Sequence, residues 1–156
     1  MVGLPHPHRD ARFYDGVRGR RVAALLVDAM LVTAAAAFAV LAFGVATLGV
    51  GLALGLPIAL TVSFLYRFLT LARWSATPGM ALFGIEARGW SGERLSDAEA
   101  AIHTGVFLLC FHLVAPQMIS LALMALRPDG RGLHDLAIGG AVINAPADSA
   151  ADMQAG

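Results

Sequence analysis

The chain contains no lysine, a single cysteine and few charged residues of either sign. All 11 basic residues are arginine and 11 residues are acidic, so the formal net charge is zero and gives no indication of nucleic-acid binding. The lone Cys110 excludes an internal disulfide and a cluster of thiolate ligands. Charged residues make up only 14% of the 156 residues, whereas a soluble domain carries about a quarter. The composition therefore argues against an ordinary soluble domain.

Most of the remaining residues are apolar: hydrophobic residues make up 58% of the chain, and its mean hydropathy is +0.70. From Val22 to Leu71 only Asp28 and Arg67 are charged. This run is far longer than the apolar core of a secretory signal, which has roughly 7–15 residues, so we predict a retained first span. The fold class expected is an all-α membrane protein in contact with the lipid bilayer.

Two segments, residues 22–43 and 52–71, are long enough to cross a bilayer, which takes about 20 apolar residues. A third apolar segment, residues 98–126, is interrupted by Pro116. We favour a hydrophobic helical hairpin here, with one arm to Val114, a turn at 115–117 and a shorter arm to Leu126. A single kinked span, which would place the C-terminus outside, is the alternative.

Arginines flank the first two spans and are absent from the turn between them. By the positive-inside rule the N-terminus and the segment after residue 71 are cytoplasmic, and the turn at 44–49 is outside. These arginines are Arg9, Arg12, Arg18, Arg20 and Arg21 before the first span, and Arg67, Arg73, Arg88 and Arg94 at or after the end of the second.

Outside the spans we expect a small cytoplasmic cap. Ile85–Arg88 alternates like a strand, and a turn at 89–92 leads to a return at 93–95, which predicts a β-hairpin. Residues 140–143 form a further strand that can pair with this hairpin if both lie on one side of the membrane. Ser96 and Glu99 are spaced as a capping box at the start of the next helix. Residues 1–19 are a polar N-terminal tail, and residues 144–156 are a disordered C-terminal tail.

Arg21 and Asp28 are the first candidate functional residues. Their i, i+7 spacing places both on one helix face, about 10 Å apart along the axis. A carboxylate within a span needs protein or water around it and marks a functional position by default. Asp28 is therefore either a proton or cation site or half of a structural ion pair with Arg21 or another arginine.

Nothing in the chain indicates catalysis or a bound cofactor. There is no glycine-rich phosphate loop, no Ser/His/Asp arrangement and no zinc-ligand spacing. His103 and His112 are nine positions apart, which puts them on different helix faces and excludes a metal pair between them. We expect a protein that is not an enzyme and has neither cofactor nor metal.

In order along the chain, these residues resemble the RDD family of small bacterial membrane proteins. The family is named for one arginine and two aspartates, matched here by Arg21, Asp28 and the Asp135 of a Leu-His-Asp motif. Its Thr-x-Gly-Lys motif is matched by residues 77–80, where Met80 replaces the lysine. Where many relatives carry arginine the chain has His103, and where a threonine is usual it has Gly140.

The resemblance covers residues 20–143 and implies a location in the bacterial inner membrane. It makes Thr77, Gly79, His103 and His134 secondary candidates beside the three named residues. It also suggests transport of a small solute, or cation/proton antiport, by an oligomer with Asp28 as the intramembrane ionisable site. The alternative is a non-catalytic accessory or assembly protein of a larger membrane complex. In that case Arg21, Asp28 and Asp135 form a structural clamp, in which Asp135 meets Arg21 and closes a three-charge network with Asp28.

Overall fold

The computed structural model describes residues 3–146, and its two longest helices form an antiparallel pair. Helix α1, Val17–Ala46, and helix α2, Gly55–Trp74, are joined by a turn and a short 3-10 helix, η2, Val50–Leu54. Both segments are long and apolar enough to cross a membrane. Pro57 is the third residue of α2, where a helix has no internal partner for its backbone N–H, so the proline does not break the helix.

The third apolar segment is a bent pair of helices. Helix α4, Asp97–His112, begins with the predicted capping box between Ser96 and Glu99. The chain turns by 113° at Leu113 and continues as α5, Val114–Leu126. The bend comes earlier than the predicted turn at 115–117. Pro116 falls in the first turn of α5, where its missing N–H costs no helical bond, so the break precedes the proline.

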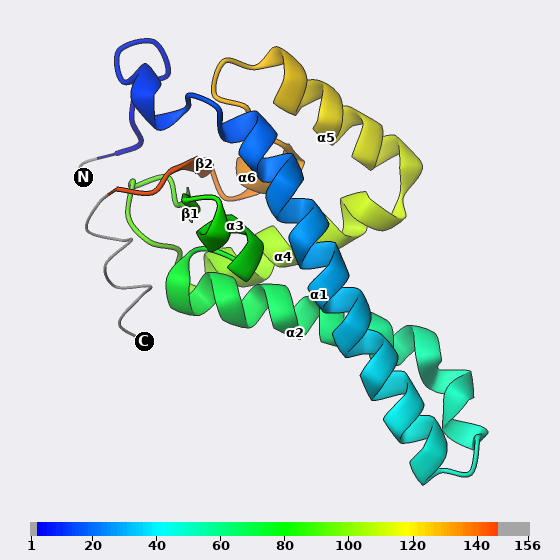
Figure 1. Cartoon of the computed structure of the whole chain (residues 1–156). Helices are drawn as coiled ribbons and strands as arrows, with labels where there is room; N and C mark the ends of the chain where they lie inside the picture. Colours follow the sequence, from blue (N-terminus) through cyan, green and yellow to red (C-terminus); the bar gives the residue numbers. More distant parts are fainter. Residues whose placement is uncertain (1–2, 147–156) are drawn as a thin grey trace.

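A small cap covers one end of the helix pair (Figure 1). It contains helix α3, Pro78–Leu82, strand β1, Ile85–Arg88, helix α6, Leu133–Ala137, and strand β2, Ala141–Asn144. Ile85 and Ile143 on the two strands are fully buried, as is Leu71 at the end of α2. The cap therefore has its own apolar core, which continues into the membrane helices.

The two strands pair antiparallel, with Ile85 opposite Asn144 and Arg88 opposite Ala141. The predicted pairing of the C-terminal strand with the Ile85–Arg88 strand is confirmed, whereas the predicted return at 93–95 contributes only one isolated bridge, between Arg88 and Arg94. In both strands the first three residues are buried, so the C-terminal segment covers β1 within the core of the cap. The sheet thus joins two parts of the chain that are far apart in sequence.

The N-terminal segment is held to this sheet. It contains a short 3-10 helix, η1, Ala11–Phe13. The Asn144 side chain donates to the carbonyl oxygens of Arg12, at 2.9 Å, and Asp15, at 3.0 Å. Arg20 donates to its amide oxygen at 3.0 Å. Asn144, assigned to a disordered tail from sequence, is thus part of β2, while residues 147–156 of that tail lie outside the described residues.

These contacts place the N-terminal segment, both strands and α6 at the start of α1, and the α1–α2 turn at the opposite end (Figure 1).

Candidate functional site: two buried carboxylates and a lone guanidinium

Asp28 lies near the middle of α1 and holds the start of α3. The Tyr66 hydroxyl donates to its Oδ1 at 2.7 Å, and the Gly79 backbone N–H donates to the same oxygen at 2.8 Å. The Thr77 hydroxyl donates to Oδ2 at 2.5 Å. We call these four residues the Asp28 clasp. Three donors thus satisfy the oxygens of a carboxyl group that is buried within a span.

The Thr-Pro-Gly turn is built for this contact. The Thr77 hydroxyl caps α3 by accepting from the Met80 N–H at 3.2 Å while it donates to Asp28. A Cβ atom at Gly79 would lie 2.8 Å from Asp28 Oδ1 and closer still to the Ala24 carbonyl oxygen. Only glycine therefore lets the α3 backbone approach α1 closely enough for its N–H to reach the carboxylate.

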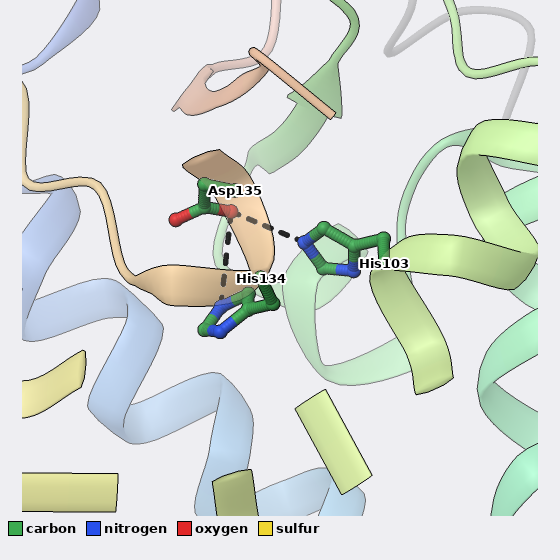
Figure 2. A group of neighbouring side chains, drawn as sticks. All are labelled: His103, His134 and Asp135. Carbon is green, nitrogen blue, oxygen red and sulfur yellow. Dashed lines mark hydrogen bonds and ion pairs between the residues drawn. The ribbon is translucent and has the colours of Figure 1, made fainter. Parts of the chain in front are cut away.

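Asp135 is the centre of a second group, the Asp135 cluster, formed with Arg21, His103 and His134. Arg21 Nη2 lies 2.7 Å from Asp135 Oδ2, and His103 Nε2 lies 3.1 Å from Oδ1. The Gly132 N–H donates to Oδ2 at 2.9 Å. Figure 2 shows the His103 ring, on α4, directed at the Asp135 carboxylate on α6. A buried carboxylate with several donors is a strong tie between α1, α4 and α6.

Electrostatics in this cluster favours an ionised Asp135 beside neutral His134. Burial alone would raise the pKa of Asp135, but the charge of Arg21 and the hydrogen bond from His103 hold it well below its usual range. Burial lowers the pKa of His134 well below its ordinary value, although Asp135 opposes this. Arg21 Nη2 lies 2.9 Å from His134 Nε2, and a guanidinium has no acceptor, so that ring nitrogen accepts and its proton is on Nδ1.

The ligand atoms of His103, His134 and Asp135 all lie within 4.8 Å of one another, a spacing that a metal ion could bridge (Figure 2). Arg21 nevertheless already provides the positive charge there, because its Nη2 contacts both Asp135 and His134. We therefore interpret the group as an arginine–aspartate–histidine network.

The structure divides the predicted network of three charges into two groups. Arg21 pairs with Asp135 and also donates to the Gly130 carbonyl oxygen at 3.1 Å. Asp28, two turns further along α1, accepts hydrogen bonds from Tyr66, Thr77 and Gly79 and does not pair with Arg21. Arg21 and Asp28 share a helix face, but each of them contacts other residues that lie nearer, so the two do not pair. Thr77 and Gly79 belong to the first group, and His103 and His134 to the second.

Arg67, which the sequence reasoning used only for orientation, lies between the two groups. Its guanidinium is 3.7 Å from the centre of the Phe107 ring. Its Nε is buried without a hydrogen-bond partner, and no ion pair is formed by this side chain among residues 3–146. The signal that could have found it is the same one that found Asp28: a charge well inside an apolar span.

Two cavities meet at this arginine. Cavity A, of about 370 Å³, lies between α1, α2 and α4. Cavity B, of about 100 Å³, lies towards the cap and includes Arg21, Ser120 and His134 in its lining. Four residues belong to the linings of both cavities, and we call them the shared wall: Leu25, Asp28, Arg67 and Phe107.

The fold and these charges define a helical membrane protein with two long apolar spans, a bent third helix pair and a cap tied down by buried ion pairs. A family model described as the RDD family matches residues 16–139. The chain belongs to the RDD family. Comparisons with curated proteins and with solved structures gave no match.

Proposed function

We propose that this RDD-family protein is a non-catalytic transporter of a small solute, with its passage running through cavities A and B. The observation that supports this is the shared wall. Four side chains line both a cavity between the spans and one that reaches the cap, and we propose that a displacement of Phe107 or Leu25 joins the two. Pockets for small molecules typically measure about 300–1,000 Å³, and cavity A is within that range.

The proposal places the protein in the inner membrane with its N-terminus in the cytoplasm. The arginines before α1 and those around the cap would then share the cytoplasmic side, as the positive-inside rule requires. The contacts of Asn144 with Arg12 and Asp15 support this, because they hold the C-terminal strand beside the N-terminal segment. The uncharged α1–α2 turn would face the periplasm.

We further propose that transport requires an oligomer. Leu26 and Phe111 at the rim of cavity A are 61% and 54% exposed, so the cavity opens sideways towards lipid. A second copy packed against α1 would close this side. Asp28 would serve as a structural part of the wall, since three donors from the chain already occupy its two oxygens.

The test is flux into proteoliposomes that contain the purified protein, with sodium ions, protons and small organic ions as probes. Leu25→Trp should block the shared wall and reduce any flux at least tenfold. Leu31→Trp is the matched control, because Leu31 is on the same helix, 45% exposed and outside both cavity linings. Flux equal to that of empty liposomes with every probe, or insensitivity to Leu25→Trp, would contradict the proposal.

A second candidate function is an accessory or assembly subunit of a larger membrane complex. It is favoured by the saturation of both carboxylates, since Asp28 and Asp135 each accept three hydrogen bonds or ion pairs from the chain itself. Charges used in this way clamp the cap onto the spans and need no solute. Purification from native membranes in a mild detergent, followed by mass spectrometry, would detect a stoichiometric partner if this candidate is correct.

A further inference from the structure

We propose that Arg67 binds the oxyanion group, carboxylate or phosphate, of an amphipathic ligand whose apolar part lies in cavity A. This inference rests on the proposed solute-binding role of that cavity and names the chemical class of the ligand. It starts from the polar side chains in the cavity lining, of which Arg67 is the one whose charge is left unpaired in the described part of the chain.

Apart from the exposed Thr33, an uncharged hydroxyl, the other hydrogen-bonding side chains in the cavity lining already have partners. Tyr66 donates to Asp28 at 2.7 Å, and Ser63 donates to the Ala59 carbonyl oxygen at 2.7 Å. His112 Nδ1 lies 2.8 Å from the Leu108 carbonyl oxygen, and Asp28 has the three donors of its clasp. These groups are engaged in holding the walls of the cavity and have little capacity left for a ligand.

Arg67 differs from all of them. A guanidinium has five N–H donors, yet none of them is used in a hydrogen bond within residues 3–146. Stacking on Phe107, with 3.7 Å to the ring centre, fixes the plane of the group without using its donors. A cation within a span is costly unless it is paired, so an unused fork of donors beside a cavity indicates a ligand with complementary acceptors. Carboxylate and phosphate match this fork in a bidentate manner.

The remaining lining indicates what the oxyanion is attached to. The cavity is bounded mainly by apolar side chains, which include Leu25, Leu26, Val32, Leu108 and Phe111. Because Leu26 and Phe111 are more than half exposed, an alkyl chain could enter from the bilayer side. The nearby Asp28 carboxylate would repel an anion, but its two oxygens are covered by the Tyr66, Thr77 and Gly79 donors. The geometry therefore favours an anionic head on Arg67 with its apolar tail along α1 and α4.

The experiment measures equilibrium binding to the full chain in nanodiscs of phosphatidylcholine. The probes are dodecanoate and dodecyl phosphate, with methyl dodecanoate and dodecyltrimethylammonium as uncharged and cationic counterparts. We expect the two anions to bind and the two counterparts not to bind. Arg67→Gln should weaken anion binding about ten- to hundredfold, the range expected for losing hydrogen bonds to a charged group.

Arg73→Gln is the matched control, since Arg73 is an exposed arginine on the same helix and does not line the cavity. If Arg67→Gln fails to fold, two other variants decide. Arg67→Lys should retain part of the affinity for the anion, because it keeps the charge and loses the fork. Val32→Phe should weaken binding of the dodecyl anions by filling the cavity, without touching a charge.

Competition by acetate and inorganic phosphate identifies the source of the ligand. Competition by the small ions at concentrations like those of the dodecyl anions would support a soluble oxyanion at Arg67, and competition by chain-bearing anions alone would support a ligand from the bilayer. Equal binding of methyl dodecanoate and dodecanoate, or wild-type affinity in Arg67→Gln, would overturn the inference. Anion binding without flux would support the Arg67 site and contradict transport. Flux that is unchanged in Arg67→Gln would support transport and contradict a role of Arg67 in it.

Discussion

At the scale of single residues, the free-energy cost of burying a charge explains why the described part of the chain has so few charged residues within its apolar helices. Asp28 is 5% exposed and Asp135 is 1% exposed, and each is surrounded by donors from several different elements. Removing one partner from a buried ion pair leaves an uncompensated charge, which is more damaging than the pair itself is stabilising. Asp135, which is paired with Arg21, should therefore respond strongly to substitution, and replacing Asp28 would leave its three donors without an acceptor.

Asp135→Asn is expected to destabilise the protein by about 3–5 kcal/mol, because it leaves Arg21 buried without its counter-charge. Thermal unfolding in detergent can be followed with a thiol-reactive dye, since the buried Cys110 becomes accessible only on unfolding. Asp15→Asn is the control: Asp15 is exposed and its side chain makes no hydrogen bond or ion pair within the described residues, and such surface substitutions change stability by less than about 0.5 kcal/mol. Equal melting of the wild type and Asp135→Asn would contradict the role of Arg21–Asp135 as a structural tie.

Stability should fall as the pH is lowered from 7.5 to 5.0, partly because of His134. Burial lowers the pKa of folded His134, so the unfolded chain, in which His titrates near about 6.5, takes up the proton first. The pKa of Asp135 is lowered in the folded protein, so its contribution to the free energy of unfolding is lost only at lower pH, from about 3.9 down to its pKa in the folded state.

His134→Gln removes the titrating ring while it keeps an acceptor for Arg21, so the melting temperature should depend less on pH in this variant. Circular dichroism at each pH gives the comparison, and His112→Gln, outside the cluster, should retain the wild-type dependence. His103 faces the same carboxylate, so some dependence should remain. A variant slope equal to the wild-type slope would count against a neutral buried His134.

At the scale of elements, the close approach of α3 to α1 depends on a missing side chain. Gly79→Ala should lower the melting temperature, because its Cβ would lie 2.8 Å from Asp28 Oδ1 and force α3 away from the clasp. Gly105→Ala is the control within helix α4, where an added Cβ meets nothing within 4 Å and should stabilise the helix by up to about 1 kcal/mol. The same thiol assay measures both variants, and similar stability of the two would contradict a tight α1–α3 contact.

The elements themselves were largely predictable, and so was the pairing of the two strands. Apolar length identified both spans, and the Ser96 and Glu99 spacing identified the start of α4, because these are local properties. The pairing of residues 140–143 with β1 was predicted, but the extent of the local return at 93–95 was not, because it is reduced to one bridge at Arg94. The bend at Leu113 was also misplaced, because the position of Pro116 marks the first turn of α5 as readily as a break.

The candidate site shows the same division. Arg21, Asp28 and Asp135 could be named from sequence because charges are conspicuous in apolar segments. Their pairing could not be named, since it depends on where the Thr77 turn and the α6 segment dock on α1. Arg67 was overlooked as a ligand-binding candidate because its position near Trp74 resembles an interface anchor, and only the cavities on both sides of it distinguish the two roles.

At the scale of the whole molecule, the bent α4–α5 pair predicts which surfaces share a side of the membrane. Single cysteines at Leu48, Trp90 and Leu126, which are 96%, 72% and 82% exposed, can be introduced into a Cys110→Ser background. A membrane-impermeant thiol reagent added outside intact cells should label position 48 alone, and positions 90 and 126 should react only after permeabilisation. Labelling of position 126 from outside would show that α4 and α5 together form a crossing span.

The tie between Arg21 and the loop before α6 also sets the order in which the protein can be assembled. Arg21 and its acceptor Gly130 are 109 positions apart, and Asp135 is further still. During synthesis, α1 enters the membrane long before either partner has left the ribosome. The first helix must therefore wait in the bilayer with its arginine unpaired, and the cap can close over it only once nearly all of the described chain has been made. Contacts of such sequence separation are formed slowly, so the nascent chain is most open to degradation, or to capture by other membrane proteins, during this interval.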